Sequence, residues 1–181
     1  MMISPETVIE QTRNWIRNVV IACNFCPFAA REIKRDSVHY EICEASDLKL
    51  VLAKFLQECI RLDDHPEIET TLIIFPSSFQ QFNKYLDLVD LAEKLLKKEG
   101  YEGVYQVASF HPDYQFAGSS AKDAANFTNR SLYPMLHLLR EESIEKALEK
   151  FPDPEGIPER NIEFARSKGE AYMKMLRDSC L

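Results

Sequence analysis

The segment that most constrains the fold is TTLIIF, residues 70–75. It is short and apolar, it is rich in β-branched side chains, and polar or turn-forming residues bound it on both sides. A run of this kind is typical of a strand that is buried on both faces of a sheet. Residues 38–43 and 104–110 also have strand character. We therefore predict that residues 70–75 form the central strand, flanked by the strands that begin at Val38 and Val104.

Segments with helical spacing of apolar residues lie between and around these strands. Ser4, Pro5 and Glu6 have the N-cap, first-position and first-turn chemistry of a helix start. Further helices are expected over residues 46–62, 78–99, 133–148 and 158–177. Strands that alternate with helices favour parallel pairing. The prediction is an α/β fold: a single compact domain over residues 1–181, with a small, mainly parallel, three-stranded sheet (β-α-β-α-β) covered by N- and C-terminal helices.

Charge and cysteine content narrow the class of protein. The net charge of −7 and the lack of a clean basic face argue against a nucleic-acid partner. No stretch approaches 18 consecutive apolar residues, and the N-terminus has no basic segment of the signal-peptide kind, so we expect neither a membrane span nor export. Five cysteines, an odd number, indicate reduced thiols. We therefore expect a cytoplasmic protein.

The segment CNFCPFA, residues 23–29, contains the first candidate reactive group, Cys26. Pro27 suits the first position of a short helix over residues 27–33, which would make Cys26 its N-cap. The amides and dipole at a helix start favour a thiolate, and Arg31 on the next turn adds positive potential, so a lowered thiol pKa is expected. The alternative is a buried structural thiol. The pair Cys23 and Cys26 follows a helix and lacks further ligands, which disfavours a redox dithiol or a zinc site.

A second group of candidates follows the strand at residues 104–110. His111 and Asp113 lie just past its carboxyl end, where ligands collect in open α/β sheets. A long polar loop, residues 112–130, comes next. Its amides, hydroxyls and cations suit an anionic ligand, and we expect substrate contacts from Ser119, Asn126, Asn129, Arg130 and, farther along, Arg140. The alternative reading assigns the same residues to turns and helix caps.

A divalent-metal site is the competing interpretation of this region. In a helix over residues 133–148, His137 and Glu141 would share one face, and with His111 and Asp113 they would make a mixed nitrogen and oxygen ligand set. Neither the H-x-H nor the H-E-x-x-H spacing occurs, so we favour the metal-free arrangement. No cofactor is favoured, and a divalent metal is kept as the alternative.

Four runs resemble a bacterial family known as domain of unknown function number fourteen-fifteen. They are CNFCPFA, YQVASFHPDYQFAG, AANFTNRSLYPMLHLLREESIEKAL and PDPEGIPERNI, and the likeness extends from about residue 7 to residue 161. The resemblance implies one continuous domain and carries no reaction with it. The usual first motif of the family is similar to Leu-Asn-Leu-Cys-Pro-Phe-Ala. On that pattern Cys26 matches the family cysteine, while Cys23 stands where leucine is expected.

Three functions are compatible with these residues. The leading hypothesis is an enzyme of small anionic metabolites in which Cys26 is the nucleophile, His111 is the base and Asp113 orients His111. Arg31 and the loop residues named above would hold the substrate. The second hypothesis is a metal-dependent enzyme, and the third is a non-catalytic ligand-sensing or interaction module. The positions of Cys26, His111 and His137 in the structure distinguish among them.

Overall fold

A four-stranded mixed sheet lies at the centre of the protein, in a computed structural model that describes residues 3–181. Its strands are β1 (Val38–Ile42), β2 (Thr70–Ile74), β3 (Tyr105–Phe110) and β4 (Met135–Arg140). The strand order is β1-β2-β4-β3. β1 and β2 are parallel, and β4 is antiparallel to both of its neighbours. The α/β class is confirmed, but the prediction of three mainly parallel strands is wrong, because a fourth, antiparallel strand separates β2 from β3.

β2 is an internal strand, as its apolar sequence predicted. All five of its residues are buried. Leu72 is in register with Tyr40 of β1 on one side and with His137 of β4 on the other. The predicted neighbour at Val38 is confirmed. The predicted neighbour at Val104 is wrong, since β3 is at the edge of the sheet beyond β4.

β4 replaces the first half of the helix expected over residues 133–148. Leu136 and Leu138 pack on one face of the sheet, whereas Met135 packs on the other. This alternation has the period of a strand, and β2 and β3 supply hydrogen-bonding partners on both sides. The helix α5 (Glu141–Glu149) begins only where β4 ends. His137 and Glu141 therefore lie in different elements and do not share a helix face.

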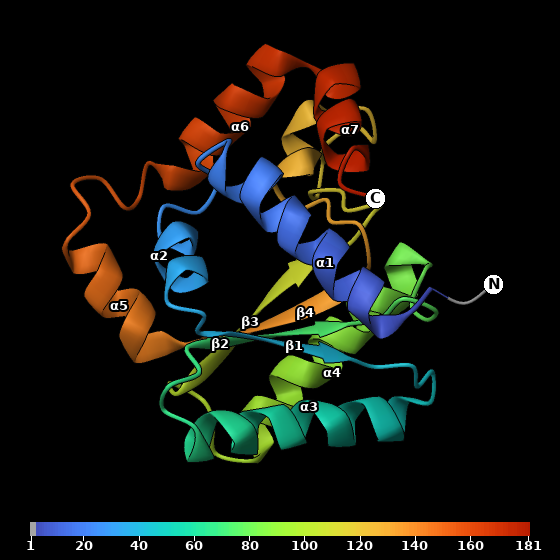
Figure 1. The fold of residues 1–181 in the computed structure, drawn as a ribbon, viewed down its shortest axis with the longest axis vertical. Coiled ribbons are helices and arrows are strands. Elements are labelled where there is room, and N and C mark those ends of the chain that lie inside the picture. Colours follow the sequence, from blue (N-terminus) through green and yellow to red (C-terminus); the bar gives the residue numbers. More distant parts are fainter. Residues whose placement is uncertain (1–2) are drawn as a thin grey trace.

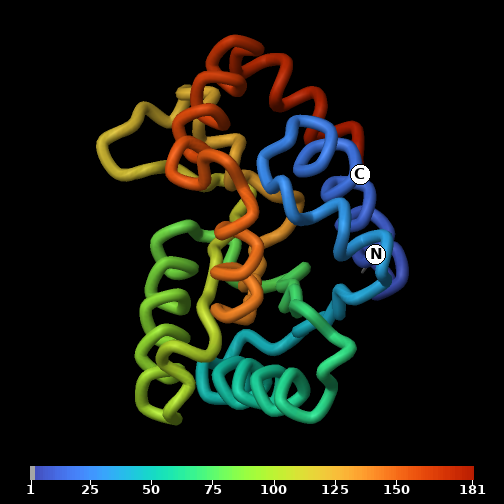
Figure 2. The backbone as a smooth tube through the Cα atoms, turned by 90° about the vertical axis from the view of Figure 1, so that its left-hand side faces the viewer, coloured from blue at the N-terminus to red at the C-terminus, as the bar shows by residue number. Residues whose placement is uncertain are grey.

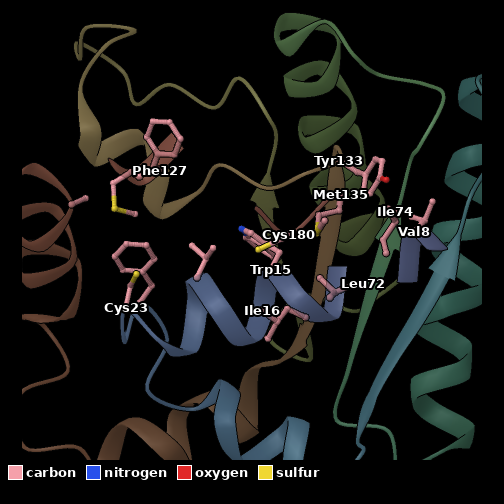
Figure 3. Packing of buried hydrophobic residues seen from close by; sticks show 14 residues of the cluster. Val8, Trp15, Ile16, Cys23, Leu72, Ile74, Phe127, Tyr133, Met135 and Cys180 are labelled. Atoms are coloured by element: carbon pink, nitrogen blue, oxygen red, sulfur yellow. The ribbon is translucent and has the colours of Figure 1, made fainter. Parts of the chain in front are cut away.

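Helices cover both faces of the sheet (Figure 1). α1 (Pro5–Trp15) and the π-helical segment η1 (Ile16–Ile21) that continues it cover one face, the α1 face. Figure 3 shows Trp15 and Ile16 close to Leu72 and Met135 in this half of the core. α3 (Leu48–Asp64) and α4 (Phe82–Lys98) cover the opposite, α3 face, where Phe55 packs with Leu136 and other buried residues.

Two of the predicted helix starts are confirmed by their caps, whereas the helix expected from residue 78 begins at Phe82 without a side-chain cap. The Ser4 hydroxyl accepts a hydrogen bond from the Thr7 amide, and Pro5 follows at the first helical position. Asp47 caps α3 by accepting hydrogen bonds from the amides at positions 49 and 50. These signals are local, so the surrounding fold does not change them.

The remaining elements pack on the same side of the sheet as α1. They are α2 (Ala29–Lys34), the 3₁₀ helix η2 (Ala124–Thr128), α6 (Ile157–Lys168) and α7 (Glu170–Asp178). Figure 2 shows the gold loop between β3 and β4 beside α6 and α7 in red. The single helix expected over residues 158–177 is interrupted at Gly169, whose φ is 83°. Within residues 3–181, no helix combines the length and the apolar character that crossing a bilayer would need.

Candidate functional site

An apolar cavity of about 410 Å³ lies between the α1 face of the sheet and the helices η1, α2 and α5. Its lining is mainly aliphatic and aromatic, with few polar groups; Trp15, Ile16, Leu72, Phe110 and Ile144 are among its walls. The residues contributed by β1, β2 and β3 include Val38, Thr70 and Gln106, which lie at the amino ends of those strands. The cavity also reaches Ala108 and Phe110 of β3, so it extends along that strand on the α1 face, whereas His111 packs beside α4.

His137 is the most distinctive polar group of the cavity wall. Its Nε2 lies 2.8 Å from the Thr70 hydroxyl, which itself lies 2.6 Å from the carbonyl oxygen of Leu138. The hydroxyl must donate its single proton to that carbonyl, so it accepts a hydrogen bond from His137 Nε2–H. This assigns the proton of neutral His137 to Nε2. Nδ1 is left as an acceptor, and the ring of His137 makes no further hydrogen bond to residues 3–181.

Burial in this apolar wall keeps His137 uncharged. Desolvation lowers its pKa to about 4, because the imidazolium form loses the hydration that it would have in water. The ring is therefore neutral throughout the physiological pH range. A neutral imidazole that already donates through Nε2 offers a ligand one hydrogen-bond acceptor and no positive charge.

Cys26 also lines the cavity, but its surroundings differ from those predicted. α2 begins at Ala29 and the N-cap position is Phe28, two residues later than expected. Burial raises the pKa of the Cys26 thiol, and hydrogen bonds from the amides of Phe28 and Ala29 offset this only in part. The prediction of a lowered pKa is wrong, because desolvation outweighs the short helix start. At neutral pH Cys26 is a thiol.

His111 is fully buried on the other side of β3 and is held by backbone groups. Its Nε2 lies 3.0 Å from the Phe79 carbonyl oxygen, and its Nδ1 accepts a hydrogen bond from the amide of Asp113 at 2.9 Å. Its ring packs against Phe82 and Tyr85. Both ring nitrogens are thus occupied, and desolvation lowers the pKa of His111. Asp113 contacts this ring through its backbone amide.

The structure does not bring the hypothetical catalytic groups together. Cys26 lines the cavity on the α1 face, while His111 packs beside α4. No hydrogen bond joins them in the part of the chain that the structure describes. The alternative metal set is not assembled either: among residues 3–181, the ligand atoms of His111, Asp113, His137 and Glu141 do not come together around one position.

The predicted anion-binding residues of the loop mainly hold the loop together. Asn126 is fully buried and bonds to Phe116, Ser119 and Ser120. Asn129 also donates a hydrogen bond to the carbonyl oxygen of residue 109, and Arg130 donates to the carbonyl oxygens of residues 114 and 121. The long loop is therefore ordered by its own polar groups, which is the turn-and-cap alternative.

The two remaining predicted cations have local partners. Arg140 donates to the carbonyl oxygens of residues 62, 65 and 68, at the end of α3 and in the turn after it. Arg31 lines the cavity, and its Nε lies 2.6 Å from the Glu32 carboxylate. Neither guanidinium is left as an isolated charge for an anion.

Thr70 is the site residue that the sequence reasoning missed. The sequence pattern identifies Thr70 only as part of an apolar strand. The available signal was its polarity: a threonine hydroxyl inside a buried strand needs a hydrogen-bond partner. The partner, His137, is 67 residues farther along the chain, so the sequence alone could not identify it.

Comparison with known proteins adds a family. The family model described as "Protein of unknown function (DUF1415)" matches residues 7–175. The chain belongs to this family. The resemblance noted in the sequence is thereby confirmed, and the matched range includes Cys26, Thr70 and His137. Neither the search of curated proteins nor the search of solved structures found a match.

Proposed function

We propose that the protein binds a small, mainly apolar, uncharged molecule carrying one hydrogen-bond donor in the cavity beneath α2 and α5. The observation that carries the proposal is the unpaired acceptor of His137 in a wall whose surface is mostly apolar. A volume of about 410 Å³ is within the range of small-molecule sites. Such sites are mostly hydrophobic, and a few fixed polar groups orient the ligand.

This proposal corresponds to the ligand-sensing module rather than to the cysteine enzyme. A nucleophilic Cys26 would need a thiolate and a nearby base. The raised pKa of its thiol and the burial of His111 among Phe82 and Tyr85 count against both requirements. Cys26 instead provides a polarisable wall beside the ligand.

The lining also favours an uncharged ligand over the anionic metabolite first expected. A carboxylate beside the Nδ1 lone pair of His137 would be repelled. The charged residues of the lining balance one another and leave no cation free for an anion: Arg31 is paired with Glu32, and Arg140, which donates to backbone carbonyl oxygens, offsets Glu69. A hydroxyl or an amide N–H has the polarity that His137 can accept.

The decisive experiment compares three probes of nearly equal size: p-cresol, toluene and p-toluate. Trp15 is the only tryptophan in the chain and lines the cavity, so its indole N–H signal in a ¹H–¹⁵N NMR spectrum reports occupancy. We expect p-cresol to bind about tenfold more tightly than toluene, because one hydrogen bond in a dry site contributes roughly 1.4 kcal/mol. We expect p-toluate to bind most weakly.

Two variants and one control make the test specific. His137→Phe should abolish the preference for p-cresol over toluene. Ala108→Phe, which places a ring opposite His137 in the register of β3 and β4, should block all three probes. Val104→Phe adds the same ring at a half-exposed position outside the cavity and should bind like wild type. Equal binding by Ala108→Phe, or no shift of the Trp15 signal with any probe at millimolar concentration, would contradict the proposal.

A further inference from the structure

A second cluster of chemically active side chains lies on the α3 face of the sheet, away from the cavity. His39 and Glu41 project from the same face of the edge strand β1, and Glu58 reaches them from α3. His39 Nε2 lies 3.4 Å from Glu41 Oε2 and 3.5 Å from Glu58 Oε2. One nitrogen and two carboxylate oxygens of these residues all lie within 4.8 Å of one another.

Glu58 shows that the cluster is incompletely satisfied. Its side chain is fully buried, and its Oε1 has no hydrogen-bond partner. Leaving a buried charged oxygen unpaired costs free energy, and proteins seldom retain such a group without a compensating ligand or partner. The other oxygen, Oε2, faces His39 and accepts a hydrogen bond from Arg61 Nε at 2.9 Å.

Two partly exposed cations lie beside the carboxylates. Lys54 Nζ is 3.0 Å from Glu41, and Arg61 contacts Glu58 and, at 3.9 Å, Glu41. The side chains of Lys54 and Arg61 are 33% and 37% exposed, so both can extend into solvent without breaking the core. Two negative charges and one imidazole would then remain around a central position, with Glu58 held on a helix and the other two on a strand.

We propose that His39, Glu41 and Glu58 form a binding site for a divalent transition-metal ion, with zinc as the best-matched class. Imidazole nitrogen and carboxylate oxygen are both zinc ligands with bonds of about 2.0–2.2 Å, so small side-chain shifts bring all three donors onto one ion. Three protein ligands leave a fourth position open for water or a small anion. Glu58 would bind the ion through Oε2, which faces His39, and a carboxylate that binds through both oxygens would also give Oε1 the partner that it lacks.

The test titrates the full-length, chelator-stripped protein with Co²⁺, and then displaces the cobalt with Zn²⁺. Cobalt at an imidazole and carboxylate site gives weak visible bands and no thiolate-to-metal band in the near ultraviolet. We expect one equivalent to bind. His39→Ala and Glu58→Gln should each lower the affinity at least tenfold. Lys54→Met, which removes a competing cation, should raise it severalfold.

His65→Ala is the matched control. His65 also lies beside a carboxylate, with Nδ1 2.9 Å from Glu67, but this pair is exposed and has no third ligand. The control should bind cobalt like wild type. Binding unchanged in His39→Ala, a thiolate-to-cobalt band at one equivalent, or no binding by the wild type would each overturn the proposal. His39→Ala keeps the test valid if Glu58→Gln does not fold, and the Trp15 indole signal reports folding in every variant.

Discussion

Thr70 and Thr71 are neighbours in β2, both are buried, and their hydroxyls meet opposite environments. Thr70 accepts from His137 and donates to the Leu138 carbonyl. The Thr71 hydroxyl has no partner. The two side chains point to opposite faces of the sheet, because successive residues of a strand alternate. The free energy that each hydroxyl contributes is thus decided by which face it occupies.

This contrast predicts opposite effects of the same substitution. Thr70→Val should lower the free energy of unfolding by about 1–3 kcal/mol, because it leaves the His137 Nε2–H donor without a partner. Thr71→Val removes only an unsatisfied hydroxyl and should be neutral or slightly stabilising. Urea denaturation of the two variants checks both values. A larger loss in Thr71→Val would show that its hydroxyl has a partner in solution.

Cys26 should react slowly despite its partial exposure. Because burial raises the pKa of its thiol, the thiolate fraction near neutral pH is lower than that of an ordinary cysteine. Alkylation by iodoacetamide, followed by peptide mass spectrometry, should be slower at pH 7.5 than alkylation of glutathione, and the rate should still be rising at pH 9. A rate that levels off below pH 8 would contradict this environment.

Gly169 separates α6 from α7 and sets the direction of the C-terminal helix. Its φ of 83° and ψ of 159° lie in a region that only glycine adopts readily. An added Cβ would meet no atom within 4 Å, so a substitution here changes the backbone preference and causes no clash. The break in the helix is therefore a local property of one residue.

Gly169→Ala should lower the free energy of unfolding by about 1–3 kcal/mol, the usual cost of a non-glycine residue in this region. Gly169→Asn should not restore stability, because asparagine tolerates the left-handed helical region and not this one. Thermal unfolding of both variants measures the effect. Wild-type stability in Gly169→Ala would mean that α6 and α7 merge into one helix without loss.

At the scale of the whole molecule, two buried histidines couple folding to pH. The pKa of His137 is lowered to about 4, and burial also lowers the pKa of His111. Both rings bind protons more readily in the unfolded chain, where the histidine pKa is near 6.5. The contribution of these two histidines to the free energy of unfolding is therefore fully present above pH 6.5, and it decreases as the pH falls toward 4.

For His137 the expected loss over this interval is roughly 3 kcal/mol, at 1.36 kcal/mol for each pKa unit. The free energy of unfolding, measured by urea denaturation at pH 7 and pH 4.5, should decrease accordingly. His137→Phe should show a smaller decrease, whereas His65→Ala, at an exposed position, should leave it unchanged. An identical decrease in His137→Phe and wild type would contradict the assigned pKa.

Several features of the protein were readable from short stretches of the chain. A continuously apolar run such as residues 70–75 has no side that can face water, so it must be internal wherever its partners lie. The caps at Ser4 and Asp47 act within one helical turn. Cys26, His137 and Arg31 were singled out because of their residue type, and all three line the cavity.

The partners of these residues were decided only by the tertiary structure. The segment MLHLLR is compatible with helical and strand periods, and it became β4 because strands on both sides satisfy its backbone hydrogen bonds. As a result, His137 lies in a strand beside Thr70, whereas Glu141 lies in the helix that follows. His111 follows the end of a strand, and hydrogen bonds to backbone groups of two loops hold it in the core. The type and spacing of residues determine the interactions within one helix or strand, such as caps. The burial and the partner of each polar group depend on segments that are distant in the chain.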